Sequence, residues 1–382
     1  MKRNIRMKKI ELVSSLGGLI VAFFLFGGNG VAAQEKKSEY FERKVSDSDS
    51  IRSEQVQELD GYILALKTNK SRLKSIFTPD YRSDKAFESS KKRLLEAFKS
   101  NIGYPIPGEA SIDLPVFKLM GEDGIGTYFR AKIPVVKGVS CDGIYIVPKG
   151  LKGRAPLIIS MHGGGGSPDV ALFHGGGNYN DMVRGGVKRG YCVFAPTHLF
   201  QANGFPNDIR NQIDERMRLV GTSLTAVEVA KISRTLDVLL KRPEIDPKRV
   251  GMVGLSYGGY YALLAAALDP RIKASVSSCY FGVQEFRYAE RELNIPSDFK
   301  FKDRFSLFLD SELVALICPR ALEIQAGDKD DAAHREGGVT LAPASKAYYD
   351  KLGKSDLFRW VIFQGQHEFN DASAWEFIGK HL

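Results

Sequence analysis

Ser256 stands between two glycines at the point where an apolar run gives way to a helix-like stretch. The segment GLSYG occupies residues 254–258 and overlaps the end of the apolar run 250–254. A sharp turn from a strand into a helix forces its central residue into strained backbone angles, and side chains two positions to either side would collide there. Glycine removes the collision, so the turn can hold the serine oxygen at the edge of a sheet, beside the positive end of the helix. The pattern predicts a nucleophilic hydroxyl at Ser256.

A second glycine-rich segment, HGGGG at residues 162–166, follows another short apolar run. A tetrahedral intermediate carries an oxyanion that needs two backbone N–H donors, one from the residue after the nucleophile and one from such a loop. The predicted donors are Tyr257 and either Gly163 or Gly164. The loop lacks the spacings of phosphate-binding loops. His162 precedes the serine in the chain, so we expect it to orient the loop and not to act as the base.

Eight short apolar segments supply the strands that must position these groups. They cover residues 126–135, 139–148, 157–161, 191–195, 250–254, 274–278, 321–326 and 358–363. The first two predict an antiparallel pair, and the later ones alternate with helix-compatible stretches. This alternation is typical of an α/β fold in which helices cover both faces of a mostly parallel sheet.

The stretch IDPKRVGMVGLSYGGYYALLAAALDPRIKA at 245–274, together with the HGGGG segment, resembles the α/β-hydrolases. Within them it is most similar to the group of secreted esterases that are acetylxylan-esterase-like or dienelactone-hydrolase-like. Prolyl-oligopeptidase-type catalytic domains share the pattern. The resemblance covers about residues 115–382 and implies the α/β-hydrolase fold with eight strands, the second antiparallel. A serine nucleophile in place of the dienelactone group's cysteine points toward esters.

The resemblance also implies a chain order of nucleophile, acid and histidine. The acid is expected after the seventh strand, where the sequence reads LEIQAGDKDDAAH. Asp330 fits the G-x-x-D spacing that members of the family commonly show, counted from Gly327. Asp331 is its rival, and other aspartates nearby are expected to be solvated turn residues.

The histidine is expected after the eighth strand and before a final helix, which is where His367 lies. His334 comes too early in the chain, and His381 lies one residue from its end. In the predicted mechanism His367 takes the proton of Ser256, Asp330 fixes the imidazole tautomer, and water then attacks the acyl-enzyme. This chemistry needs no metal and no organic cofactor.

Two long segments, after the fourth and sixth strands, are expected to shape a substrate pocket. His198 and Arg210 in the first are candidate contacts for a polar or acidic substrate, and ordinary loop hydrogen bonding is the alternative. Aromatic residues in the second could stack on a sugar, with lid packing as the alternative. The candidates are Tyr280, Phe281, Phe286 and Tyr288.

The first 33 residues have the layout of a secretory signal peptide, with a basic start, an apolar run and small residues before an expected cut ahead of Gln34. The apolar run is short for a membrane span, so we expect an exported protein, secreted or periplasmic, without a stable membrane anchor. Residues 34–114 are expected to form a helical extension that packs on a catalytic domain at 115–382. Its apolar residues at helical spacing are Phe87, Leu94, Leu95 and Phe98.

The formal net charge of +9 falls once residues 1–33 are removed, because five basic residues and one acid lie there. The remaining charges are dispersed, so a nucleic-acid surface is not expected. The four cysteines lack metal-ligand spacing and are expected to be buried thiols, although the sequence leaves open whether one pair oxidises after export. They are Cys141, Cys192, Cys279 and Cys318.

Export and ester chemistry together predict an enzyme that removes acetyl groups from carbohydrate or from related small esters. An S9-like serine peptidase is the alternative among enzymes, but residues 34–110 are too few for the propeller that usually accompanies it. A non-catalytic binding protein with a hydrolase fold is the alternative from another class. It would have no reason to keep the nucleophile, acid, histidine and both oxyanion elements together.

Overall fold

The structure is a computed structural model, and it describes residues 44–173, 177–199, 207–289 and 296–382. The chain divides into two units, Met1–Glu58 and Leu59–Leu382. The expected signal peptide and its cleavage site lie outside the described residues. Within the described ranges, no helix is both long enough and apolar enough to cross a membrane.

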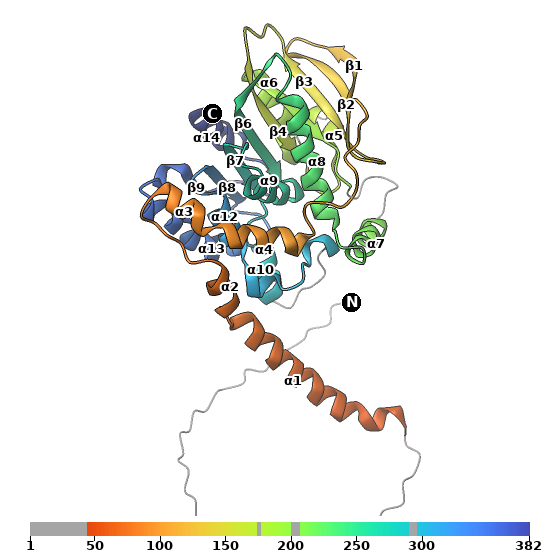
Figure 1. Ribbon diagram of the computed structural model, residues 1–382, viewed down its shortest axis with the longest axis vertical. Helices are drawn as coiled ribbons and strands as arrows, with labels where there is room; N and C mark the ends of the chain where they lie inside the picture. The colour runs from red at the N-terminus through yellow and green to blue at the C-terminus, as the bar shows by residue number, and fades with distance from the viewer. Residues whose placement is uncertain (1–43, 174–176, 200–206, 290–295) are drawn as a thin grey trace, which may run out of the picture. The chain divides into compact units, whose positions relative to one another are not determined.

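A nine-stranded sheet forms the centre of the second unit (Figure 1). The strands lie in the order β1-β2-β3-β5-β4-β6-β7-β8-β9. Pairs among β4 to β9 are parallel, whereas β1–β2, β2–β3 and β3–β5 are antiparallel. Their bounds are β1 Val116–Glu122, β2 Gly126–Val136, β3 Val139–Pro148, β4 Ala155–Met161, β5 Cys192–Pro196, β6 Ile245–Leu255, β7 Ala274–Ser278, β8 Ala321–Gly327 and β9 Phe358–Phe363.

The eight predicted strands correspond to β2–β9, and the second of them, β3, is antiparallel to its neighbours. The predicted number of eight was wrong by one, because β1 at the sheet edge was missed. Its side chains are almost all exposed, including Val116 and Leu119, so it lacks the alternation of buried and exposed residues that identifies a strand. An irregular register at Gly121 breaks its pattern further.

Helices cover both faces of the sheet, as the sequence predicted (Figure 1). In β4, Leu157 and Ile159 belong to the core beneath α8 and α9, whereas Ile158 belongs to the core beneath α6 and α14. The helical elements that follow β3 are α5 Pro168–Phe173, η2 Gly177–Tyr179, α6 Met182–Lys188, α7 Asn207–Arg218, α8 Leu224–Leu239, α9 Tyr257–Leu268, α10 Val283–Ala289, η3 Ser297–Phe299, α11 Arg304–Leu307, α12 Asp310–Ile317, α13 Ala332–Lys351, η4 Ser355–Leu357 and α14 Asp371–His381.

The described chain before the sheet is helical, and residues between Phe77 and Ile102 join the main core. Phe87, Leu94 and Phe98 are fully buried, and Phe98 meets Phe308 edge to face at 5.1 Å between ring centroids. Gly103, at φ 74°, follows the last helix of this segment, α4 (Lys92–Ile102), and ends it in a left-handed conformation. The elements are η1 Val45–Ser48, α1 Asp49–Thr68, α2 Ser71–Ile76, α3 Asp84–Ser90 and α4 Lys92–Ile102.

The four cysteines are buried, as the sequence favoured, and none of them is paired with another in the described residues. Cys141 lies in β3 and Cys192 in β5, while Cys279 follows β7 and Cys318 follows α12. Burial raises the pKa of every one of these thiols. Their thiolate forms are therefore disfavoured at neutral pH.

Candidate active site

The predicted strand-to-helix turn is present at Ser256. β6 ends at Leu255 and α9 begins at Tyr257, and Ser256 between them has φ 58° and ψ −116°. A positive φ is rare outside glycine and stores strain when the surrounding structure enforces it. The strained turn predicted from the sequence is therefore confirmed.

The two glycines of the turn lie against backbone atoms. A Cβ on Gly254 would stand 2.1 Å from the carbonyl oxygen of Gly258, and a Cβ on Gly258 would stand 2.0 Å from the carbonyl oxygen of Met161. Neither distance admits a carbon atom. The need for glycine at both positions is confirmed, although the collisions are with carbonyl groups of α9 and β4 and not with the serine.

The glycine-rich loop after β4 lies against the serine side chain. A Cβ placed on Gly163 would be 3.3 Å from the Cβ of Ser256. The Gly163 N–H donates a hydrogen bond to the Tyr179 hydroxyl at 3.0 Å. Among the described residues, the exposed Gly164 N–H has no hydrogen-bond partner. Of the two glycines proposed as oxyanion donors, Gly164 is therefore the one whose N–H is still available.

His162 holds this loop in place. Its Nε2 accepts the His198 N–H at 3.4 Å, so its Nδ1 carries the proton and donates to the Gly163 carbonyl at 2.9 Å. Burial lowers the pKa of His162 to about 4, so the ring is neutral at pH 7. The ring orients the loop, in agreement with the expectation from chain order.

His367 and Asp330 are hydrogen-bonded to each other. His367 Nδ1 lies 3.0 Å from each carboxylate oxygen of Asp330. Asp330 follows β8, and His367 lies between β9 and α14, at the positions that the resemblance implied. The rival acid, Asp331, instead accepts the Ala333 N–H at 2.8 Å as the N-cap of α13 and pairs with Arg287 at 3.1 Å.

A second imidazole shares the Asp330 carboxylate. His334 Nδ1 lies 2.9 Å from Asp330 Oδ1, and the rings of His334 and His367 are 4.6 Å apart. Burial opposes ionisation, but the hydrogen bonds from the two histidines hold the pKa of Asp330 well below its usual range. The carboxylate is therefore ionised at neutral pH. His334, which chain order had set aside, lies beside the acid.

A chain of hydrogen bonds connects the serine turn to the loop that carries His367. The Ser256 N–H donates to the Ser278 carbonyl at 2.7 Å, and the Ser278 hydroxyl donates to the carbonyl of Glu368 at 3.2 Å. Both segments thus meet at the carboxyl edge of the parallel strands. In the described parts of the chain, no hydrogen bond joins Ser256 Oγ to His367, and such bonds are often long in ligand-free sites.

Cys279 lies close to Asp330 and His367, and three such side chains could together hold a metal ion. One ligand atom each from Cys279, Asp330 and His367 lie within 4.8 Å of one another. Burial raises the pKa of the Cys279 thiol to about 12, which disfavours the thiolate that a metal needs. Since Asp330 and His367 already bind each other, the hydrogen-bonded pair accounts for the cluster without an ion.

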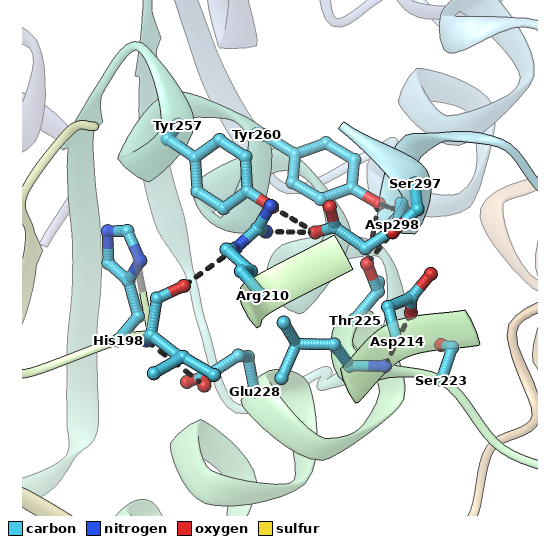
Figure 2. A network of polar contacts seen from close by, with 12 residues as sticks. His198, Arg210, Asp214, Ser223, Thr225, Glu228, Tyr257, Tyr260, Ser297 and Asp298 are labelled. Carbon is cyan, nitrogen blue, oxygen red and sulfur yellow. Dashed lines mark hydrogen bonds and ion pairs between the residues drawn. The ribbon is translucent and has the colours of Figure 1, made fainter. Parts of the chain in front are cut away.

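A buried ion pair anchors the residue that follows Ser256 (Figure 2). Arg210 of α7 pairs with Asp298 of η3, and their side chains are 2% and 0% exposed. Asp298 also accepts a hydrogen bond from the Tyr257 hydroxyl, and the Arg210 guanidinium lies 4.2 Å from the centroid of the Tyr257 ring. Arg210 Nε donates to the Leu199 carbonyl at 2.6 Å. The pair therefore joins the segments after β5 and β7 to the serine turn.

Burial of Asp298 disfavours the ionised form of its carboxyl group. Burial raises its pKa to about 6, although the guanidinium of Arg210 opposes the rise. Its backbone carbonyl accepts hydrogen bonds from Thr225 at 3.0 Å and from the Tyr260 hydroxyl at 3.2 Å (Figure 2). These contacts fix the position of η3 relative to α8 and α9.

The four residues suggested as substrate contacts lie inside the protein and not at an open surface. His198 stacks on His162 at 4.0 Å and on Tyr257 at 5.2 Å between ring centroids, so it supports both halves of the predicted oxyanion site. The aromatic pair packs in the core, which was the alternative that the sequence left open. The exposed fractions are His198 3%, Arg210 2%, Tyr280 3% and Phe281 1%.

Sequence reasoning missed Tyr179, His334 and Asp298. A signal existed for His334, because it stands four residues after Asp330 at the start of an expected helix, a spacing that brings side chains together. Tyr179 meets a glycine 16 residues away and Asp298 meets an arginine 88 residues away. No local sequence pattern predicts contacts between residues so far apart in the chain.

Comparison with known proteins agrees with this architecture. Residues 167–300 match the Dienelactone hydrolase family. The Bacillus subtilis (strain 168) protein YtaP, which is assigned as a hydrolase, is 26% identical over 235 residues, covering 58% of this chain and 76% of YtaP. A Bacteroides fragilis structure assigned as an acetyl xylan esterase has a TM-score of 0.63 at 15% identity, covering 88% of this chain and 90% of the other. A glucuronoyl esterase from Solibacter usitatus has a TM-score of 0.59 at 15% identity, covering 78% of this chain and 94% of the other.

The matched segment and the likeness to the solved structures agree on the architecture: the chain has the α/β-hydrolase fold. The resemblance stated from the sequence is confirmed, including its dienelactone-hydrolase-like segment, which spans the serine turn and the two segments after β5 and β7. At these identities, the likeness to the solved structures concerns the fold.

Proposed function

We propose that the protein is an exported serine esterase that cleaves carbohydrate or related small esters through an acyl-enzyme. The observation that carries the proposal is the convergence of three features at one edge of the sheet. These are the strained Ser256, the glycine loop in contact with it, and the Asp330–His367 pair. A binding protein would have no need of the strained turn together with an ionised carboxylate bonded to an imidazole.

In the first step, Ser256 Oγ attacks the acyl carbon of the ester while its proton passes to His367. The Asp330 carboxylate accepts the proton-bearing Nδ1 of His367, which leaves Nε2 as the nitrogen that can take up the serine proton. The negative charge of Asp330 stabilises the imidazolium that forms. The protonated imidazole then donates its proton to the departing alcohol oxygen.

The oxyanion of the tetrahedral intermediate is assigned to two backbone N–H groups. Tyr257 supplies one at the N-terminus of α9, where the helix dipole favours negative charge. Gly164 supplies the other, because the Gly163 N–H is bonded to the Tyr179 hydroxyl. Water activated by His367 then attacks the acyl-enzyme and releases the acid, which restores Ser256.

The class of substrate is inferred from two kinds of support. The chain resembles in fold an acetyl xylan esterase and a glucuronoyl esterase, whose names both denote esters of carbohydrate. The predicted signal peptide at residues 1–33 would deliver the enzyme to where such polymers lie. Mass analysis of the exported protein tests the second point, and a mature N-terminus at Gln34 is expected.

Steady-state kinetics of wild-type and variant protein test the proposal. The substrates are p-nitrophenyl acetate, acetylated xylan and a chromogenic prolyl peptide. Both esters should be hydrolysed, and Ser256→Ala should lower kcat by about three or more orders of magnitude. Cleavage of the peptide alone would support the S9-like peptidase, and no turnover of any substrate would support a non-catalytic binding protein.

The two histidines on Asp330 provide a matched pair of variants. His367→Ala should lower kcat about as severely as Ser256→Ala, because residues of one catalytic unit act together. His334→Ala should keep kcat within about tenfold of wild type, because the His334 ring lies beside Asp330 and His367 and is not assigned the serine proton. The reverse order of effects would transfer the role of base to His334.

A further inference from the structure

We infer that a cavity in the segment between β7 and β8 binds a sugar ring that bears a carboxylate. The carbohydrate part of this assignment rests on the proposed function, whereas the charge and the shape come from the cavity itself. The cavity has a volume of about 440 Å³ and is formed by α10, by α11 and by the chain that connects η3 to α11. That volume falls within the range of roughly 300–1,000 Å³ that small-molecule sites occupy.

Aromatic side chains make up half of the cavity wall. Tyr288, Phe299, Phe301 and Phe305 are four of its eight lining residues, and the rings of Tyr288 and Phe305 are 4.5 Å apart. Aromatic rings accept the flat C–H face of a pyranose by apolar contact and leave its hydroxyl groups at the edges of the ring. Tyr288 is the one residue of the sugar-stacking face suggested by the sequence that lines this cavity.

The cavity adjoins the serine turn through one of its walls. The ring of Phe299 stacks on that of Tyr257, with centroids 4.9 Å apart and an interplanar angle of 20°. Tyr257 directly follows Ser256. The Phe299 ring thus lies between the cavity and the Tyr257 ring, and the residues that line the cavity include none of the predicted catalytic or oxyanion residues. A ring bound in the cavity would be separate from the predicted ester site, as a different unit of the same carbohydrate chain would be.

Positive charge surrounds the opening. Lys300 and Lys302 line the cavity and are exposed, and in the described ranges neither ammonium group has an ion-pair partner. Lys67 Nζ lies 4.6 Å from the centroid of the Tyr288 ring and adds a third cation, part of whose charge is offset by the Glu285 carboxylate. A neutral sugar would gain little from these cations, whereas a carboxylate would be attracted by all three.

Two buried residues of the cavity wall, Arg304 and Gln284, have polar atoms that make no hydrogen bond in the described residues. Arg304 and Gln284 both line the cavity, and their exposed fractions are 3% and 1%. Arg304 Nη2 pairs with Glu285 and Asp310, but in the described residues its Nε and Nη1 and the Oε1 of Gln284 have no partner. Buried donors and acceptors are rarely left unused, and ring hydroxyls or a carboxylate would satisfy them. An aromatic acid would offer no hydroxyl to Gln284.

Isothermal titration of protein that carries Ser256→Ala tests this inference without any turnover. The ligands are a disaccharide of glucuronate and xylose, the neutral disaccharide xylobiose, and benzoate. The acidic disaccharide is expected to bind with a Kd at least about tenfold below that of xylobiose, and the difference should shrink as salt is added. Equal affinity for the two sugars, or no binding of either, would overturn the inference, and so would benzoate binding as tightly as the acidic sugar.

Two pairs of charge reversals locate the site. Lys300→Glu/Lys302→Glu should raise the Kd of the acidic disaccharide about tenfold or more. The matched control is Lys118→Glu/Lys132→Glu, which reverses two exposed lysines on β1 and β2 at the far end of the sheet order and should leave the Kd unchanged. Equal effects of the two pairs would reject the cavity as the site. Because binding is measured without hydrolysis, this failure would leave the esterase proposal standing, and absence of hydrolysis would leave the cavity proposal standing.

Discussion

Gly258 occupies a position where even one added carbon collides with the loop on the other side of the predicted active site. In Gly258→Ala the new Cβ would lie 2.0 Å from the carbonyl oxygen of Met161 and 2.8 Å from that of His162. Real Cβ atoms essentially never approach closer than 3.0 Å, so α9 and the end of β4 must separate by about 1 Å. Both atoms belong to backbone, which cannot turn aside as a side chain can.

The separation acts on stability and on catalysis at once. Overpacking of this size lowers the free energy of unfolding by about 1–3 kcal/mol. The displaced segments carry Tyr257 and Gly164, the two donors assigned to the oxyanion, and a misplacement of about 1 Å can reduce the rate roughly a hundredfold. We therefore expect kcat/KM for p-nitrophenyl acetate to fall about a hundredfold while the variant still folds.

Urea unfolding and steady-state kinetics measure the two effects side by side. The control is Gly124→Ala in the exposed turn between β1 and β2, where an added Cβ would meet no heavy atom within 4 Å. The control should match wild type in both assays. If Gly258→Ala kept kcat/KM within about threefold of wild type, the contact between the serine turn and the oxyanion loop would not have the role given to it here.

Three further predictions concern the groups around the serine turn. Arg210→Met should lower the free energy of unfolding in urea by about 3–5 kcal/mol, because Asp298 stays buried without its cation, and adding Asp298→Leu should recover most of the loss. The pKa of Asp298 is about 6 in the fold against 3.8 for an ordinary aspartate, so the folded state binds this proton more tightly than the unfolded state. Its contribution to stability should therefore decrease by roughly 3 kcal/mol as pH rises from about 4 to 6, measured as the difference between wild type and the Arg210→Met/Asp298→Leu protein, and a flat difference would contradict the assignment. Tyr179→Phe should lower kcat about tenfold with little change in KM, because the Gly163 N–H loses its acceptor and the loop loosens, and an unchanged kcat would exclude that support.

The serine turn and the parallel sheet were predictable because their signals are local. A strand-to-helix turn needs small residues at fixed offsets from Ser256, and buried parallel strands are continuous apolar runs that stand out from the helices between them. The pairing of Asp330 with His367 was reached through the chain order of the family. β1 was not predicted because it is an exposed edge strand. Without a buried face, its sequence does not alternate between apolar and polar residues.

The contacts that support the site were not predictable, because they join residues far apart in the chain. Arg210 suggested a substrate contact, since a charged residue in a long loop is normally exposed. Only the fold shows that Arg210 is buried and forms an ion pair with Asp298, which lies 88 residues later in the chain. Likewise, chain order set His334 aside as the base, yet His334 lies beside the acid, because one turn of α13 brings it back over Asp330.

Covalent labelling with a fluorophosphonate probe tests whether Ser256 is the nucleophile, since the probe reacts only with an activated nucleophile. We expect a single adduct on the folded protein, located at Ser256 by peptide mass mapping. The adduct should disappear in Ser256→Ala and form far more slowly in His367→Ala than in His334→Ala. An adduct at another residue, or no adduct on folded wild-type protein, would contradict the assignment of Ser256 as the nucleophile.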